Sequence, residues 1–94
     1  MNFIQATLKN DLYGLREILG EKGDKILLSA KIVVKEMDGF HPCFIYYNEK
    51  TDCNGIAHIN HFAFSEVDIN LLPVIGHTEK WIDLFAEWKE TENQ

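Results

Sequence analysis

The amino-acid sequence predicts an α+β fold in which a three-stranded antiparallel β-meander is flanked by an N-terminal and a C-terminal helix (αβββα). Apolar residues recur at helical spacing near both ends of the chain and alternate with polar residues in its centre. Two dipeptides, Asp38-Gly39 and Asn54-Gly55, are typical of tight hairpin turns. The length of 94 residues, with 46% hydrophobic and 26% charged residues, suits a single α+β domain over residues 1–94.

The first helix is expected over residues 2–23. Asn2 and Gln5 have the spacing of a capping box. Gly14 in the interior and Asn10-Asp11, which can cap a separate helix, weaken this prediction. A strand over residues 3–8 followed by a shorter helix is the alternative. The apolar residues that form the helical stripe are Ile4, Leu8, Leu12, Leu15 and Leu19.

The meander is expected to begin with a strand over residues 25–36. A two-residue turn at Asp38-Gly39 pairs Val34 with Cys43, and a second turn at Asn54-Gly55 pairs Tyr47 with Phe62. Both registers place apolar residues on the same face, and a slip of one residue would destroy this agreement. The predicted core face comprises Leu28, Ala30, Ile32, Val34, Cys43, Ile45, Tyr47, Phe62 and Phe64.

The opposite face of this meander is also too apolar to lie fully in water. It carries Phe44 and Tyr46 beside Lys31 and Lys35. A terminal helix packed on each side of the sheet, or a second copy of the chain in a homodimer, would cover this face. The alternative is that the face is a docking patch for another protein.

A loop with one helical turn is expected over residues 65–77, followed by a helix over residues 78–90 that begins at the N-cap Thr78. One face of this helix is apolar and includes Trp81, Phe85 and Trp88. The opposite face forms an acidic row that consists of Glu79, Asp83, Glu87 and Glu90. The apolar face predicts packing on the sheet, and the acidic row is either a solvated face or a docking surface.

Charge and hydropathy narrow the class of protein. Fifteen acidic against nine basic residues give a net charge of −6, which repels nucleic acid and favours encounter with a basic protein. No apolar run approaches the roughly 20 residues of a membrane helix, and residues 1–5 do not resemble a signal peptide. We therefore expect a cytoplasmic protein that binds neither nucleic acid nor membrane.

Potential metal ligands and nucleophiles are numerous in the central part of the chain, but the predicted register separates them. Structural zinc sites use short ligand spacings, whereas nine residues lie between the two cysteines and no C-x-x-C pair occurs. We expect two free thiols, no metal, no cofactor and no enzymatic activity; a metal-dependent or cysteine/histidine-dependent enzyme using His58, His61 or Cys53 is the alternative. The candidates are His41, Cys43, Cys53, His58, His61 and His77.

The function that these patterns favour is a protein-binding module. The acidic row would present charge to a basic partner, and Phe44, Tyr46 and Asp52 would supply further contacts. Small size and acidity are also properties of immunity proteins and antitoxins that cover the basic cleft of a nuclease, an analogy of charge and size alone. Homo-oligomerisation is a third alternative.

Overall fold

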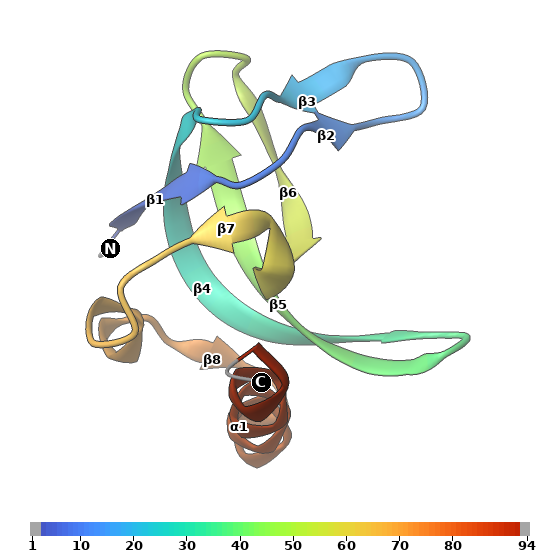
Figure 1. The fold of residues 1–94 in the computed structure, drawn as a ribbon, viewed down its shortest axis with the longest axis vertical. Helices are drawn as coiled ribbons and strands as arrows, with labels where there is room; N and C mark the ends of the chain where they lie inside the picture. Colours follow the sequence, from blue (N-terminus) through green and yellow to red (C-terminus); the bar gives the residue numbers. More distant parts are fainter. Residues whose placement is uncertain (1–2, 93–94) are drawn as a thin grey trace.

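The computed structural model describes residues 3–92 and is mostly β-structure (Figure 1). This corrects the predicted three-stranded meander between two helices: within the described residues there are eight strands and a single α-helix, at the C-terminal end. The strands are β1 (Ile4–Leu8), β2 (Leu12–Tyr13), β3 (Ile18–Gly20), β4 (Lys25–Glu36), β5 (Gly39–Asn48), β6 (Cys53–His58), β7 (Phe62–Ala63) and β8 (Val74–Ile75). The helices are η1 (Ile59–His61), η2 (Asp68–Leu71) and α1 (Thr78–Glu92).

The long strand β4 organises the main sheet, whose strand order is β6-β5-β4-β1-β7. Its first residues pair with β1, while further along Lys31 and Ile32 pair in parallel with β8. The sheet curls around its core, and the hairpin of β4 and β5 extends beyond the other strands (Figure 1). A separate two-stranded sheet is formed by β2 and β3.

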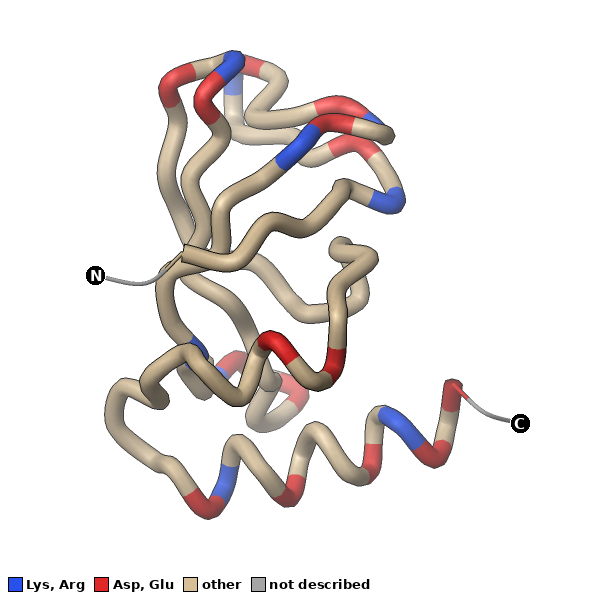
Figure 2. The backbone as a smooth tube through the Cα atoms, turned by 90° about the vertical axis from the view of Figure 1, so that its left-hand side faces the viewer, with Lys and Arg blue, Asp and Glu red and all other residues tan. Residues whose placement is uncertain are grey.

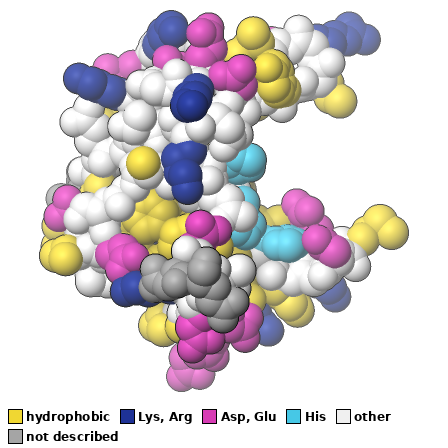
Figure 3. All heavy atoms as spheres, viewed as in Figure 1, with side chains coloured by type: hydrophobic (Ala, Val, Ile, Leu, Met, Phe, Trp, Pro, Cys, Tyr) yellow, Lys and Arg dark blue, Asp and Glu magenta, His cyan; other side chains and the backbone are white. Residues whose placement is uncertain are grey.

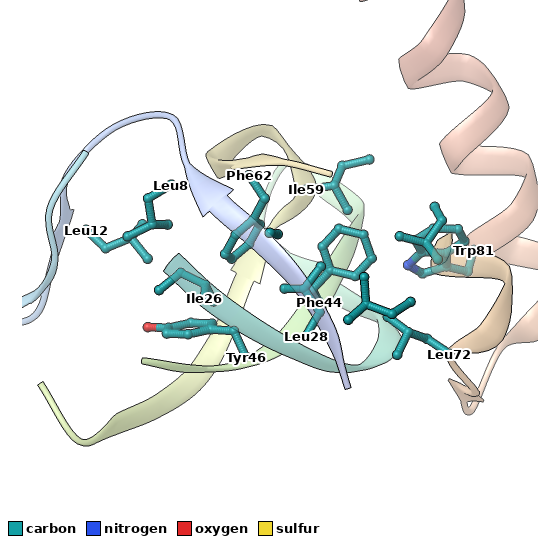
Figure 4. Close-up of a cluster of buried hydrophobic side chains, with 13 residues drawn as sticks. Leu8, Leu12, Ile26, Leu28, Phe44, Tyr46, Ile59, Phe62, Leu72 and Trp81 are labelled. Atoms are coloured by element: carbon teal, nitrogen blue, oxygen red, sulfur yellow. The ribbon is translucent and has the colours of Figure 1, made fainter. Parts of the chain in front are cut away.

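The hydrophobic core lies within the curl of the sheet and continues toward α1 (Figure 4). Phe44 and Phe62 meet edge to face with ring centroids 5.8 Å apart, and Tyr46 lies 5.8 Å from Phe62. Burial of such large side chains is the main source of stability. The core cluster comprises Ile4, Ala6, Leu8, Leu12, Ile26, Leu28, Phe44, Tyr46, Ile59, Phe62, Ile69, Leu72 and Trp81.

The predicted strand over residues 25–36 is confirmed, but the predicted core face of β5 is wrong. The turn residues are Met37 and Asp38, so Val34 pairs with His41 rather than with Cys43. A bulge between Leu28 and Ala30 then changes which residues share a face. As a result Phe44 and Tyr46 join Ile26 and Leu28 in the core cluster, whereas Cys43, Ile45 and Tyr47 do not.

The second predicted hairpin turn is also wrong. Strand β5 runs on to Asn48, which pairs with Cys53, so the connection is formed by residues 49–52 and Asn54-Gly55 lies within β6. Asp52 takes a left-handed backbone conformation (φ 52°) there, which Asp tolerates better than most residues. The consequence is a register in which Cys43 pairs with His58.

The predicted N-terminal helix does not form. Ile4, Ala6 and Leu8 alternate inward in β1, so the spacing of four between Ile4 and Leu8 also satisfies the period of two of a strand. Leu15, expected in the core, is fully exposed in the connection between β2 and β3. The alternative of a strand over residues 3–8 is confirmed, without the shorter helix after it; the expected cap Asn2 lies outside the described residues.

The C-terminal region follows the prediction except that strand β8 forms within the expected loop. Residues 68–71 form one 3-10 turn, and α1 begins at Thr78. Trp81 is 2% exposed, and its ring stacks on Phe85 with centroids 5.2 Å apart. Its Nε1 donates a hydrogen bond to the carbonyl oxygen of Cys43 at 3.2 Å, which joins α1 to β5. Between residues 3 and 92, no helix is long and apolar enough to cross a membrane.

Candidate functional site

A cleft of about 500 Å³ opens between two projecting arms of the molecule (Figure 3). We call residues 11–20, which include β2 and β3, the β2–β3 arm, and residues 34–41, the tip of the β4 and β5 hairpin, the β4–β5 arm. Histidine side chains gather at the inner end of the hollow in Figure 3. The cleft is lined by Leu12, Tyr13, Leu19, Val34, Glu36, Asp38, His41, Cys43, Tyr46, Ile56, Ala57, His58 and His61.

Polar contacts hold the β2–β3 arm to the main sheet. Asn48 is fully buried at the end of β5, and its Nδ2 donates to the carbonyl oxygen of Leu19 at 3.3 Å and to Asp24 Oδ2 at 3.2 Å. Its Oδ1 accepts a hydrogen bond from the backbone N–H of Lys50 at 3.1 Å. Thr51 Oγ1 also donates to the carbonyl oxygen of Leu19. The upper wall of the cleft therefore depends on a small polar network.

The β4–β5 arm is attached differently, because it continues the main sheet and lies near α1. Phe40 on this arm has the ammonium groups of Lys80, at 4.1 Å, and Lys35, at 5.7 Å, above its ring. Both contacts are favourable cation–π interactions. The lower wall of the cleft is thus built from sheet pairing and aromatic contacts.

Three histidines line the cleft, and each has a defined environment. The rings of His41 and His58 meet edge to face with centroids 5.6 Å apart. His41 Nε2 donates to Asp38 Oδ1 at 2.7 Å, and His58 Nδ1 accepts the backbone N–H of Asn60 at 3.0 Å. His61 Nδ1 lies 2.9 Å from the side-chain nitrogen of Asn10. The rings are therefore oriented by neighbouring groups.

The electrostatic environment keeps two of these rings uncharged near neutral pH. Burial lowers the pKa of His58, and charge repulsion with the neighbouring His41 and His61 rings lowers this pKa further. Burial likewise lowers the pKa of His61. Neutral imidazoles retain one nitrogen lone pair that can accept a hydrogen bond or bind a metal ion.

The thiol in the cleft is not activated. Cys43 is 5% exposed, and burial, followed by the negative charge of Glu36, raises its pKa to about 11. Since the thiolate is the nucleophilic form, Cys43 is protonated at neutral pH. Both cysteines are free, as expected.

The structure brings together only part of the predicted constellation of ligands. Cys43 and His58 are cross-strand neighbours, and His41 and His61 line the same cleft. Cys53 lies at the opposite end of β6, and His77 is exposed just before α1. The expected register missed this cluster because it placed the second turn too late in the chain.

The predicted partner-binding residues separate into three groups. Phe44 and Tyr46 are 0% and 3% exposed, so they belong to the core, and the prediction that they contact a partner at the surface is wrong. Asp52 is exposed but lies in the β5–β6 connection, at the opposite end of the molecule from α1 (Figure 1). The acidic row of α1, formed by Glu79, Asp83, Glu87 and Glu90, is exposed along its length and visible in Figure 2.

Glu36 and Asp38 are cleft residues that sequence reasoning missed. The signal was available in the segment from Glu36 to His41: two acids and a histidine on the two sides of a hairpin turn. A turn at Met37-Asp38 places Glu36 diagonally across from His41, within side-chain reach.

Comparison with known proteins adds no assignment. No protein-family model, curated protein or solved structure matches the chain.

Proposed function

We propose that this protein is a cytoplasmic protein-binding module that recognises a basic partner through the acidic row of α1. The main observation behind this proposal is that both lysines of α1 contact residues outside the helix. Lys80 lies 4.1 Å above the ring of Phe40, and Lys89 forms an ion pair with Glu66 at 2.6 Å. The neighbouring lysines are thus directed to other elements, and neither is paired with the acidic row.

The arrangement of the acidic row suits a linear array of positive charges. Glu79, Asp83 and Glu87 follow at intervals of four residues, which places them about 6 Å apart along the helix axis. Because the helix is already formed, these carboxylates are presented without a further cost of ordering the backbone. Such a row imitates consecutive phosphates, so an inhibitor of the immunity or antitoxin type that covers a nuclease cleft is the form of partner binding that we favour.

The test is an affinity capture with variants of matched charge. The wild type is compared with an Asp83→Lys/Glu87→Lys variant and with a Glu17→Lys/Glu49→Lys variant, which changes net charge equally at exposed sites away from α1. We expect one basic, stoichiometric protein to be retained by the wild type and by the control, and to be lost with the α1 variant. Equal loss with both variants would show that net charge alone matters.

A kinetic measurement sharpens the test. If the acidic row steers the encounter, the association rate with the captured protein will fall steeply as salt increases, whereas the dissociation rate will change less. Inhibition of an enzymatic activity of the captured protein would identify the inhibitor type. An association rate that does not respond to salt would contradict the proposal.

A further inference from the structure

We propose that the β4–β5 arm carries a binding site for a divalent transition-metal ion, formed by Glu36, Asp38 and His41. One ligand atom from each residue lies within 4.8 Å of the other two. One imidazole nitrogen and two carboxylate oxygens form a mixed donor set that suits ions such as Zn²⁺. The site is independent of the acidic row of α1.

The hairpin register explains why these three side chains meet. Glu36 pairs with Gly39 and Val34 pairs with His41, so Glu36 and His41 are diagonal neighbours on one face of the arm. Asp38 lies in the turn between them, and its carboxylate accepts the hydrogen bond of the His41 ring. The turn therefore brings three ligands into one place from a segment of six residues.

The remaining distance can be closed by side-chain rotation. Two ligands that bind one ion at about 2.1 Å lie at most about 4.2 Å apart, slightly less than the 4.8 Å within which the three ligand atoms lie. Glu36 is exposed, and the Asp38 side chain is 71% exposed, so both can rotate without disturbing the core. The ion would also neutralise two neighbouring carboxylates.

The proposed metal site lies next to the titratable side chains of the cleft. Glu36 acts on groups inside the cleft, because its charge contributes to raising the pKa of Cys43 and opposes the lowering of the pKa of His58. The ring of His58 lies beside that of His41. Since His58 Nδ1 accepts the N–H of Asn60, the proton of its neutral ring resides on Nε2. We therefore assign His58 as a hydrogen-bond donor through Nε2 and not as a ligand.

The experiment is a calorimetric titration of the chain with Zn²⁺, repeated with Mg²⁺ and followed by backbone amide NMR. We expect one Zn²⁺ per chain, chemical-shift changes centred on residues 34–43, and no comparable response to Mg²⁺, which prefers six oxygen ligands. His41→Ala and Asp38→Asn should each weaken Zn²⁺ binding at least 10-fold, about the lower limit for the loss of an outer partner of a metal site.

Three controls make the assignment falsifiable. His77→Ala and Glu49→Gln change exposed residues outside the cleft and should keep the wild-type affinity. His58→Gln should also keep it, because His58 is assigned as a donor. Absence of saturable one-to-one binding would overturn the proposal, as would a loss with His58→Gln or His77→Ala equal to that with His41→Ala. Asp38→Asn keeps the test valid if His41→Ala does not fold.

Discussion

The two arms form opposite walls of the same cleft, but different interactions hold them. The β4–β5 arm continues two long strands and rests near α1, where aromatic rings and lysine side chains pack. The β2–β3 arm is held by its own short pairing, by the apolar contacts of Leu12 and Leu19, and by hydrogen bonds from Asn48 and Thr51. The two arms should therefore respond to different substitutions: the first to loss of aromatic packing, and the second to loss of polar contacts.

The largest expected effect comes from Trp81, which supports the side of the core next to the β4–β5 arm. Trp81→Ala removes a ring that is 2% exposed, together with its hydrogen bond to the carbonyl oxygen of Cys43. We expect the free energy of unfolding to fall by about 3 to 5 kcal/mol. Urea denaturation measures this loss.

Ile82→Ala is the matched control on the same helix, because Ile82 is 55% exposed. Its effect should stay within about 0.5 kcal/mol. Phe85→Ala should fall between the two, since Phe85 is half-buried. A loss below about 1 kcal/mol for Trp81→Ala would contradict the role of α1 as part of the core.

Asn48 provides the corresponding test of the β2–β3 arm. Asn48→Ala removes the two hydrogen bonds donated to Leu19 and Asp24 and the one accepted from Lys50. Because the polar groups bonded to Asn48 lose this partner, we expect the free energy of unfolding to fall by about 2 kcal/mol. Amide hydrogen exchange should also accelerate over residues 12–20 more than over β4 and β5. Asn54→Ala, at an exposed position in β6, is the control; uniform acceleration would contradict a local tether.

Gly20 tests whether close packing also positions this arm. An added Cβ would lie 2.5 Å from Leu8 Cδ1 and 3.2 Å from Asn48 Nδ2. Gly20→Ala should therefore cost about 1 to 2 kcal/mol through forced displacement of its neighbours. Gly14→Ala is the matched control, because its Cβ would meet no atom closer than 3.4 Å. Equal melting temperatures of the two variants would show that the arm adjusts freely.

The elements that could be predicted from sequence are those with strong local signals. Helix α1 combines sufficient length with a full apolar face, and β4 is a long run of β-branched and apolar residues, so both signals are local. The residues of β1 fit a helix and a strand alike, because Ile4 and Leu8 share a face in both. Residues 4–8 form a strand because they pair with β4 and β7, and the local sequence pattern does not indicate this pairing.

The candidate site was harder to predict because its members depend on register. The bulge beside Ser29 exchanges the faces of the β4 and β5 hairpin, which moves Phe44 and Tyr46 from an expected surface to the core. A loop at residues 49–52 moves His58 next to Cys43. Neither a bulge nor a loop length leaves a clear local signal, whereas the acidic row on α1 follows directly from helical periodicity.

The smallest expected effect concerns the histidines between the two arms. The pKa values of His58 and His61 are lowered in the folded chain, mainly by burial, whereas in the unfolded chain both rings take up protons near pH 6.5. Below that pH the unfolded state therefore binds more protons than the folded state, so stability falls as the pH falls. The free energy of unfolding should decrease between about pH 7 and 5.5, before the carboxylates titrate near their usual pKa values of about 4.

A His58→Gln/His61→Gln variant should flatten this dependence of stability on pH. His77→Gln changes an exposed histidine outside the cleft and should leave the dependence unchanged. Denaturation curves across this range measure the slope, and a wild-type stability that is constant or increases on acidification would show that the two rings are not held neutral by the cleft.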